Sequence, residues 1–361
     1  MNIGIVAPYN TEKPAGFERT TLGILEGVLQ QSTEHSVTIY AKKGSGLKPL
    51  LAAYPHATFV ELGFGLLWKD LGLRFAPKAD VYVLIGQQVP LFFRPKPFVV
   101  FVYDLAYKHI PAPTVKGKIM ARLMDALMRG SCKSAAAIIG LSQATCDDVR
   151  AMFGVAPDKL RVVYPGFHDM ASVQEEPIKV PEKYFLSMGT IKKRKNNFAA
   201  ISAFAQFKKS HPEYSLVLAG KYDPEKPYLK KIFSFIKQEG LEDSVALLGR
   251  VSDAQVAYLY KHAFAVVFPS LLEGFGYPIL EAASCGVPVI TSNKSSLKEV
   301  AGDSALLVDP TSADAIASAM ARFADDQGLR QAIIQKGKQR IKDFSWDKTG
   351  MRFLEVVEKI K

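Results

Sequence analysis

The feature that most constrains this fold is an alternation of short apolar segments with helical patterns, which runs through the chain twice. The apolar runs, such as Phe98–Tyr103 and Ala263–Phe268, have the length of strands and show no alternation with polar residues. Strands of this kind between helices are typical of parallel sheets that helices cover on both faces. The series breaks at Pro165–Pro181, which we interpret as a linker. We therefore predict an α/β protein with two doubly wound domains in tandem, whose facing sheets would form a cleft for ligands.

The composition indicates a folded protein with an anionic partner. Hydrophobic residues make up 48% of the 361 residues, which excludes disorder, and 46 Lys and Arg against 35 Asp and Glu give a net charge of +11. Residues 42–118 alone hold eleven basic and four acidic side chains. This local surplus indicates a phosphate-bearing substrate, a membrane surface or nucleic acid, or else only a solvated surface.

Three features of the sequence bear on its compartment. Three cysteines at no metal-like spacing cannot form a disulfide framework, which favours a reducing compartment. The first residues carry no basic stretch and reach Pro8 too early for a signal peptide. No segment approaches the roughly 18 apolar residues of a spanning helix. We expect a cytoplasmic protein and leave open a position at the inner face of the membrane.

The most informative segment lies between a buried strand that ends at Ser270 and the helix that follows it. Gly274 and Gly276 let the backbone approach a ligand closely, and the N-terminus of a helix attracts an anion. The carboxylates of Glu273 and Glu281 would repel a phosphate alone, but they accept hydrogen bonds from hydroxyl groups. The segment therefore predicts a ligand with phosphate and hydroxyl groups, such as a sugar nucleotide. The alternative is an ordinary helix N-terminus, whose dipole favours acidic residues.

A basic turn follows directly after the predicted strand Tyr184–Met188. Lys192–Lys195 places four consecutive cations between a strand and a helix. Their mutual repulsion is costly unless an anion binds there. The turn therefore predicts an anion site, with a solvated basic loop as the alternative.

These segments resemble motifs of the retaining GT-B glycosyltransferases of the glycosyl-transfer group-one class, family four, and of its mannosyltransferases in particular. Glu273 and Glu281 match the E-x7-E motif of that family. The resemblance implies a GT-B fold, with two Rossmann-like doubly wound domains facing across a cleft and a C-terminal helix that crosses back to the first domain. We accordingly expect an acceptor-binding domain over residues 1–168 together with the helix 346–361, and a donor-binding domain over residues 178–345.

The resemblance also implies roles for residues of the second domain. Glu273 would face the donor sugar, and Glu281 would hold the ribose hydroxyls. Residues 189–196 are similar to the G-T-x-x-x-R-K-N motif of the family, so Lys195 and Arg194 are expected to stabilise the leaving diphosphate. Further donor-binding residues are expected in the same loops and in the turn that meets the base: Thr190, Arg250, Val251, Gly274, Phe275, Gly276 and Tyr277.

The first domain resembles the family more weakly. Gly16 stands where relatives usually carry a glycine pair and would let the backbone approach the donor diphosphate, although Ala15 departs from the pattern. Asp104 follows a buried strand and is expected at the catalytic position of the cleft. Tyr103 replaces the histidine of many relatives, so the role of that imidazole is not carried over. Tyr103 and His109 are the candidates for contacts with the acceptor.

The implied reaction transfers a glycosyl group from a nucleotide diphosphate sugar to a glycan or a lipid-linked acceptor, with retention at the anomeric carbon. The chain contains no Asp-x-Asp, so we expect no metal and no cofactor, with cations stabilising the leaving group. Retention could use one carboxylate as a nucleophile. The resemblance instead commits Glu281 to the ribose and favours a front-face mechanism. GDP-mannose is the expected donor, and nucleic acid is the least expected partner.

Two segments of the first domain could contact an anionic membrane and receive a lipid-linked acceptor. Phe64–Phe75 mixes large apolar and basic residues around Trp68, and Lys116–Lys133 predicts an amphipathic helix bordered by cations. The alternative is that both segments are core helices with charged rims.

Two further functions are compatible with such a chain. A catalytically inactive sugar-nucleotide-binding module is favoured by Tyr103, while Glu273, Glu281 and Lys195 argue against it. A GT-B sugar-nucleotide epimerase would carry more acid and base residues in the first domain. A dinucleotide dehydrogenase lacks support because no G-x-G-x-x-G follows a predicted strand.

Overall fold

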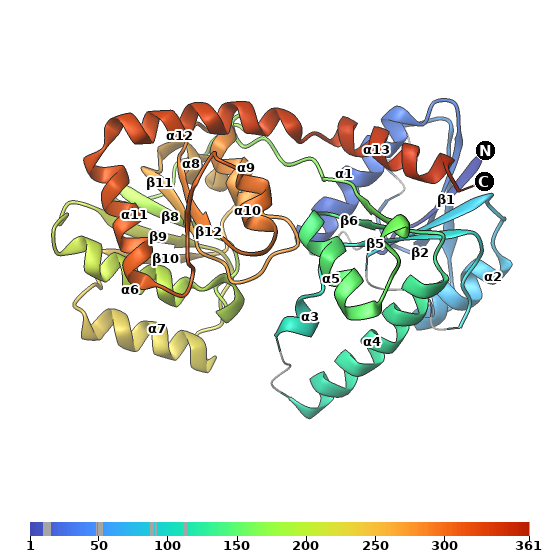
Figure 1. Cartoon of the computed structure of the whole chain (residues 1–361), viewed down its shortest axis with the longest axis horizontal. Helices are drawn as coiled ribbons and strands as arrows, with labels where there is room; N and C mark the ends of the chain where they lie inside the picture. Colours follow the sequence, from blue (N-terminus) through green and yellow to red (C-terminus); the bar gives the residue numbers. More distant parts are fainter. Residues whose placement is uncertain are drawn as a thin grey trace. The chain divides into compact units, whose positions relative to one another are not determined.

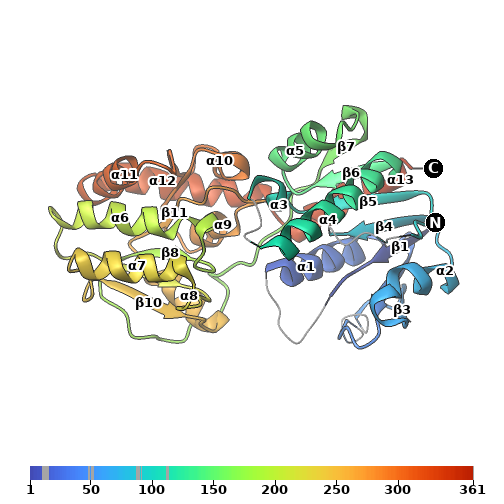
Figure 2. The same ribbon diagram turned by 90° about the horizontal axis from the view of Figure 1, so that it is seen from below.

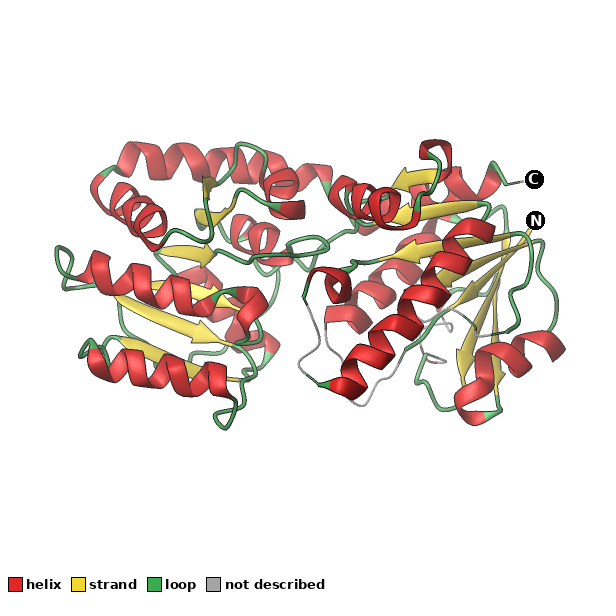
Figure 3. Cartoon of the chain, turned by 60° about the horizontal axis from the view of Figure 1, so that its bottom comes forward, coloured by secondary structure: helices red, strands yellow, loops and turns green. Residues whose placement is uncertain are grey.

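The computed structural model describes residues 1–9, 16–47, 49, 53–86, 90, 92–110 and 114–360, and it divides into two compact units (Figure 1). The first unit comprises Met1–Phe167 and the last segment of the chain from Phe344 onward, and the second comprises His168–Asp343. Each unit contains one parallel sheet with helices on both faces, so the predicted pair of doubly wound α/β domains is confirmed (Figure 3). Among the described residues, no helix is long and apolar enough to cross a membrane.

The sheet of the first unit has seven parallel strands in the order β3-β2-β1-β4-β5-β6-β7. The strands are β1 (Asn2–Val6), β2 (Ser36–Lys42), β3 (Ala57–Leu62), β4 (Val81–Ile85), β5 (Phe98–Val102), β6 (Ala137–Gly140) and β7 (Leu160–Val162). The helices are α1 (Gly16–Gln31), α2 (Leu73–Phe75), α3 (Ala106–His109), α4 (Val115–Ser134), α5 (Gln143–Phe153) and α13 (Trp346–Glu358). Shorter helical turns are η2 (Gly65–Leu67), η3 (Trp68–Gly72) and η4 (Pro157–Lys159).

Strand β4 shows why both faces of this sheet are apolar. Val83 and Ile85 pack into the same core as α1 and α13, whereas Tyr82 and Leu84 pack into a second core with residues of α4 and α5. Successive side chains of a strand point to opposite faces, so a strand buried on both faces needs a continuous apolar run. This is the pattern from which the sequence predicted a parallel sheet.

The C-terminal helix α13 packs closely against α1, as the resemblance predicts (Figure 1). Glycines make this approach possible, because a Cβ atom on Gly350 would lie 2.0 Å from the carbonyl oxygen of Gly27. A Cβ atom on Gly27 would in turn lie 2.1 Å from the carbonyl oxygen of Trp346. The two helices therefore touch through their backbones, and the end of the chain completes the first unit.

The sheet of the second unit has six parallel strands in the order β10-β9-β8-β11-β12-β13. The strands are β8 (Tyr184–Met188), β9 (Ser215–Ala219), β10 (Val245–Gly249), β11 (Ala265–Phe268), β12 (Val289–Ser292) and β13 (Leu306–Val308). The helices are α6 (Asn197–Lys208), α7 (Pro227–Gln238), α8 (Asp253–His262), α9 (Tyr277–Ser284), α10 (Ser295–Ala301), α11 (Ala313–Asp325) and α12 (Gln327–Arg340), with turns η5 (Lys193–Lys195) and η6 (Ile341–Asp343).

Neighbouring residues of β8 again face opposite layers of helices. Phe185 packs into the core formed with α6, α7 and α11, and α6 and α7 lie side by side (Figure 2). Tyr184 points the other way and donates a hydrogen bond to the carbonyl oxygen of Leu259 in α8, at 2.8 Å. Both layers therefore hold β8 in place next to β11, at the centre of the sheet.

Two strands lie outside the elements that the sequence predicted. β3 is an edge strand of the first sheet and has several half-buried residues, and β13 is an edge strand of the second sheet and has only three residues. Neither has the continuous apolar run that identified the central strands.

Candidate functional site

The candidate site of the second unit forms where the central strands β8 and β11 end. These strands are parallel neighbours, so the loops after their carboxyl ends meet at one edge of the sheet. The loop after β8 carries η5, and the loop after β11 carries Glu273. The structure thus brings together the two segments that the sequence singled out separately.

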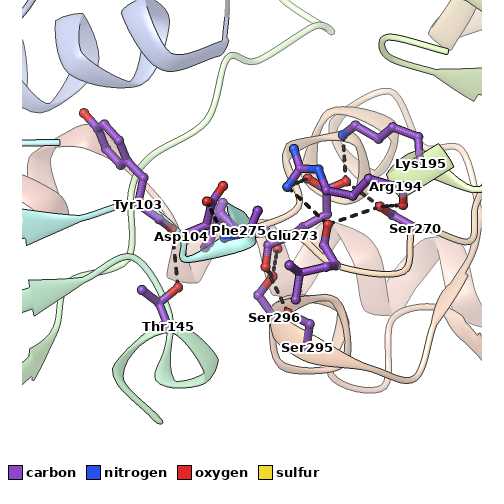
Figure 4. A network of polar contacts seen from close by, with 12 residues as sticks. Tyr103, Asp104, Thr145, Arg194, Lys195, Ser270, Glu273, Phe275, Ser295 and Ser296 are labelled. Atoms are coloured by element: carbon purple, nitrogen blue, oxygen red, sulfur yellow. Dashed lines mark hydrogen bonds and ion pairs between the residues drawn. The ribbon is translucent and has the colours of Figure 1, made fainter. Parts of the chain in front are cut away.

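Glu273 forms the centre of this loop cluster (Figure 4). Its Oε1 atom lies 2.8 Å from Nζ of Lys195, and its Oε2 atom lies 3.5 Å from Nη1 of Arg194. The hydroxyl of Ser270 donates a hydrogen bond to Oε1 at 2.5 Å. The side chain of Glu273 is largely buried, with 9% of its surface exposed. One carboxylate therefore holds two cations in fixed positions at the end of the sheet.

The charges of this cluster keep Glu273 ionised. Burial alone would raise the pKa of its carboxyl group, but the charges of Lys195 and Arg194 and the hydrogen bonds from Lys195 and Ser270 lower the pKa below its ordinary value. The three charged groups together carry a net charge of +1. The cluster can therefore attract an anion while it holds its own acidic group in the charged form.

This arrangement changes the meaning of the four consecutive cations in the sequence. Lys192 and Lys193 are exposed, whereas Arg194 and Lys195 are paired with Glu273. The repulsion that predicted a bound anion is therefore partly relieved by solvent and by a carboxylate of the chain itself. The anion site now rests on the two paired cations rather than on the whole basic run.

Backbone hydrogen bonds join the two loops. The amide of Leu271 donates to the carbonyl oxygen of Arg194 at 2.9 Å. Asn196, in the left-handed conformation with φ 57°, ends the turn η5, and its side-chain amide donates to the carbonyl oxygens of Pro269 and Pro310. Asparagine tolerates this backbone conformation better than most residues. These bonds fix the position of the cations relative to Glu273.

Two serines at the start of α10 hold the loop from Glu273 to Phe275 (Figure 4). The hydroxyl of Ser296 lies 2.8 Å from the carbonyl oxygen of Glu273 and 2.7 Å from that of Phe275, and the hydroxyl of Ser295 donates to the former at 3.0 Å. Sequence reasoning missed both serines. Their position directly after β12, a third neighbouring strand, is the signal that could have found them.

Gly276 begins the turn into α9 with φ 132°, a conformation that side chains rarely adopt. A Cβ atom there would also lie 2.8 Å from the side chain of Leu297. The glycine is therefore required for the loop itself, apart from any approach of a ligand. Tyr277 is the first residue of α9, and Gly274 and Phe275 are buried in the loop before it.

Glu281 lies on α9 and has a hydrogen-bond partner on another helix. The hydroxyl of Tyr260, a fully buried residue of α8, donates to Oε2 of Glu281 at 2.7 Å. Burial and the charge of Glu281 raise the pKa of Tyr260, so this tyrosine stays a donor. Tyr260 is a third residue that the sequence did not identify, because nothing near it in the chain points to Glu281.

The other predicted donor-binding residues lie at the same edge of the sheet. Thr190 is exposed just after β8, and Arg250 and Val251 follow β10. The next helix, α8, is capped by Ser252, whose hydroxyl accepts a hydrogen bond from the amide of Gln255 while the Gln255 side chain accepts one from the amide of Ser252.

In the first unit, Tyr103 and Asp104 follow β5. The Tyr103 side chain is buried, lies edge-on to Phe17 and shares a hydrogen bond with the hydroxyl of Thr21 at 2.9 Å. Asp104 accepts a hydrogen bond from the amide of Ala106, which orders the start of α3. The tyrosine that replaces the expected histidine is thus anchored to α1.

His109 and Gly16 complete the predictions for the first unit. His109 is exposed at the end of α3, with Nε2 2.8 Å from Oδ2 of Asp148. Gly16 is the first residue of α1, and a Cβ atom there would meet nothing within 4 Å, while Ala15 lies outside the described residues. Over the described part of the chain, no group of three or more His, Cys, Asp or Glu residues could hold a metal ion.

Two stretches of the chain match known protein families. Residues 16–169 match the family described as Glycosyltransferase Family 4, and residues 170–340 match the family described as Glycosyl transferases group 1. The two matches divide the chain close to the boundary between the structural units.

Two curated relatives are mannosyltransferases of bacterial O-antigen chains. The chain is 30% identical to O-antigen chain mannosyltransferase B of Escherichia coli over 276 residues. This matched region covers 74% of this chain and 71% of that protein. The chain is also 31% identical to O-antigen chain mannosyltransferase RfbU of Salmonella typhimurium over 186 residues. This matched region covers 51% of this chain and 50% of that protein.

The fold is similar to that of a solved structure. A crystal structure of Anabaena HepE in complex with UDP and glucose has a TM-score of 0.75 to this chain at 20% sequence identity, over 99% of both chains. This likeness confirms the predicted GT-B fold.

Proposed function

The chain belongs to glycosyltransferase family 4, and within that family we propose that it transfers a hexosyl group, with mannosyl preferred, from a nucleotide diphosphate sugar to a glycan or lipid-linked acceptor. The reaction would retain the configuration at the anomeric carbon and use no metal. One observation carries the proposal: Glu273 holds Lys195 and Arg194 together at the carboxyl ends of β8 and β11.

The two cations suit the leaving diphosphate. When the bond between the anomeric carbon and the diphosphate oxygen breaks, the electron pair stays on that oxygen, and negative charge develops there. Lys195 and Arg194, already fixed by Glu273, would stabilise this charge without rearranging. The acceptor hydroxyl would attack the anomeric carbon from the side that the diphosphate leaves, and its proton would pass to a phosphate oxygen.

Glu281 would bind the donor through its ribose. A carboxylate accepts hydrogen bonds from the two ribose hydroxyls, and Tyr260 orients it from the core of the unit. Glu281 is then unavailable as a nucleophile. This division of work between two carboxylates supports a front-face mechanism over one with a covalent intermediate.

The preference for mannose comes from the relatives. Two relatives of about 30% identity are described as mannosyltransferases, whereas HepE was crystallised with UDP and glucose. We therefore place GDP-mannose first and a UDP-linked hexose second. The same relatives are named for O-antigen chains, which supports a glycan acceptor here. The preferred acceptor is a growing bacterial surface polysaccharide, to which the enzyme would add a sugar in the cytoplasm.

A screen of nucleotide sugars tests this function. We expect the matching donor, at about a hundred times its Kd, to raise the melting temperature by roughly 5 °C or more, since binding contributes about 2.7 kcal/mol at that concentration. GDP-, UDP-, dTDP- and ADP-sugars are compared, with the nucleoside monophosphates as controls. Product from GDP-mannose, with its anomeric configuration assigned by NMR, supports the proposal. Failure of all four donors to bind or to be turned over would refute it.

Tyr260→Phe tests the role of Glu281. Removing one hydrogen bond, worth about 1 kcal/mol, is expected to raise KM for the donor roughly fivefold with little change in kcat. Tyr184→Phe is the matched control, because it removes a buried tyrosine hydroxyl bonded only to the backbone of α8. Equal KM values in the two variants would contradict a role for Tyr260 in donor binding.

A further inference from the structure

The loop from Glu273 to Phe275 is supported by α10, and this helix is short. α10 has seven residues, Ser295–Ala301. A helix below about 12–15 residues is marginal in isolation, because the cost of forming its first turn is offset only over several further turns. The position of α10 therefore depends on contacts at its two ends, and so does the position of the loop that it supports.

Two serines fix the first turn of α10 to this loop (Figure 4). Ser296 is fully buried, and its hydroxyl lies within 2.8 Å of the carbonyl oxygens of both Glu273 and Phe275. Ser295 donates to the carbonyl oxygen of Glu273 and has φ 54°, a left-handed conformation that is uncommon for residues other than glycine. Such a conformation persists only where the surroundings hold it in place. The start of α10 and the loop are thus firmly joined.

Arg340 of α12 binds the other end of α10. Its Nε atom donates to the carbonyl oxygen of Val300 at 3.0 Å, and its Nη2 atom donates to that of Glu299 at 2.7 Å. The last four carbonyl groups of a helix have no partner within the helix, and a cation there also interacts favourably with the helix dipole. Arg340 therefore supplies partners for two of these carbonyl groups and stabilises the end of α10.

The guanidinium group of Arg340 is itself fixed. Its Nη1 atom lies 2.8 Å from Oδ2 of Asp343 in η6, so all three of its nitrogen atoms form hydrogen bonds. Only 27% of the Arg340 side chain is exposed. The donors of a guanidinium group form a rigid planar fork, so these bonds together define one orientation of the side chain. Arg340 is thus a fixed connection between α12 and α10.

We propose that Arg340 is a positioning residue of the transfer reaction. Through α10 it holds the two serines in place, and the serines hold the loop that carries Glu273, the carboxylate paired with Lys195 and Arg194. Arg340 binds α10 at the end opposite to the serines, so its effect passes along the length of one short helix. The inference rests on the proposed function, because it assigns Arg340 to the reaction of the same site.

The kinetics of Arg340→Gln test this role. We expect kcat to fall about tenfold, since a hydrogen bond from a charged group contributes this much or more. The affinity for GMP, or for UMP if the screen selects a uridine donor, should stay within about twofold, because α9 and the turn after β10 are assigned to the nucleoside. Arg340→Lys keeps the charge but not the fork, and it should recover part of the loss in kcat.

Lys336→Gln is the matched control, because Lys336 lies four residues earlier on α12 and pairs with Asp303 at 3.0 Å. It should keep the kcat of the wild type, and all variants are measured at least 10 °C below their melting temperatures. A fall in kcat of equal size in Lys336→Gln and Arg340→Gln would overturn the inference.

A double-mutant cycle with Ser296→Ala tests whether the effect passes through α10. Two residues that act through one element have non-additive effects. We expect the kcat of the double variant to lie within about twofold of the more impaired single variant. Losses that multiply would mean that Arg340 and Ser296 act separately, which contradicts the proposal.

Hydrogen exchange separates this inference from the proposed function. The amides of residues 271–276 should exchange several times faster in Arg340→Gln than in the wild type and Lys336→Gln, whereas those of β9 should not change. Faster exchange in a chain that transfers no sugar would support the connection from Arg340 to the loop and refute the proposed function. Unchanged exchange of the loop, or unchanged kcat in an active enzyme, would overturn the inference.

Discussion

Glu273→Gln is expected to lower turnover by roughly 10²–10³-fold, the range found when one preorganised electrostatic group is removed from an active site. The side chain keeps its size, but Lys195 and Arg194 lose the charge that holds them 2.8 Å and 3.5 Å from it. Without the shared carboxylate, the two cations are no longer held next to each other. The negative charge that develops on the diphosphate then loses their stabilisation. Steady-state kinetics with the donor identified by the screen measure the effect.

The binding of the nucleoside diphosphate alone separates catalysis from damage to the fold. Glu273→Gln removes a negative charge beside the two cations, so the diphosphate should bind at least as tightly as to the wild type. Lys195→Ala should weaken the same binding about tenfold or more, because it removes a charge-assisted contact worth about 1.5–3 kcal/mol. Opposite directions in the two variants support the assigned roles.

Stability has to be followed in the same experiment, because removing one partner of a buried ion pair costs about 3–5 kcal/mol. Glu213→Gln serves as the matched control, since Glu213 pairs with Lys183 at 3.1 Å on the surface of the same unit. That variant should keep full activity. Near-normal turnover in folded Glu273→Gln would contradict the central role given to this carboxylate.

The position of the site could be predicted from the sequence because its main parts are local. The loop with Glu273 and the turn with Lys195 each follow a strand directly, and strands of a doubly wound sheet deliver such loops to one edge. Neither required knowledge of the partner segment. The fold was predictable for the same reason, since residues such as Val83 and Leu84 show their burial on both faces in the local pattern.

The residues that orient the site could not be predicted, because they act across the fold. Tyr260 reaches Glu281 from another helix, and Ser296 reaches the carbonyl oxygens of Glu273 and Phe275 from the start of α10, after a third strand. Tyrosine and serine occur throughout the chain, so neither residue type is informative without the contact. The basic run could not be interpreted fully for the same reason: the structure pairs two of its four cations with Glu273, a contact that the sequence does not show, and the anion site stays a prediction.

The contact between α1 and α13 leads to the second large effect, which concerns stability. In an isolated helix, replacing glycine by alanine stabilises by about 1 kcal/mol. At Gly350 the added methyl group would meet the carbonyl oxygen of Gly27 at 2.0 Å, so the helices must separate. We expect Gly350→Ala to lower the free energy of unfolding by about 2–3 kcal/mol, a typical cost of overpacking.

The sign of this change is the test, and urea denaturation followed by circular dichroism measures it. Gly63→Ala is the matched control, because a Cβ atom at Gly63 would meet nothing within 4 Å. It should change stability by less than about 0.5 kcal/mol, as surface substitutions usually do. The loss in Gly350→Ala should appear in the first unit, which contains both helices, while nucleotide binding by the second unit persists. A more stable Gly350→Ala would mean that the helices do not touch through their backbones, and that the chain's last helix is not an integral part of the first unit.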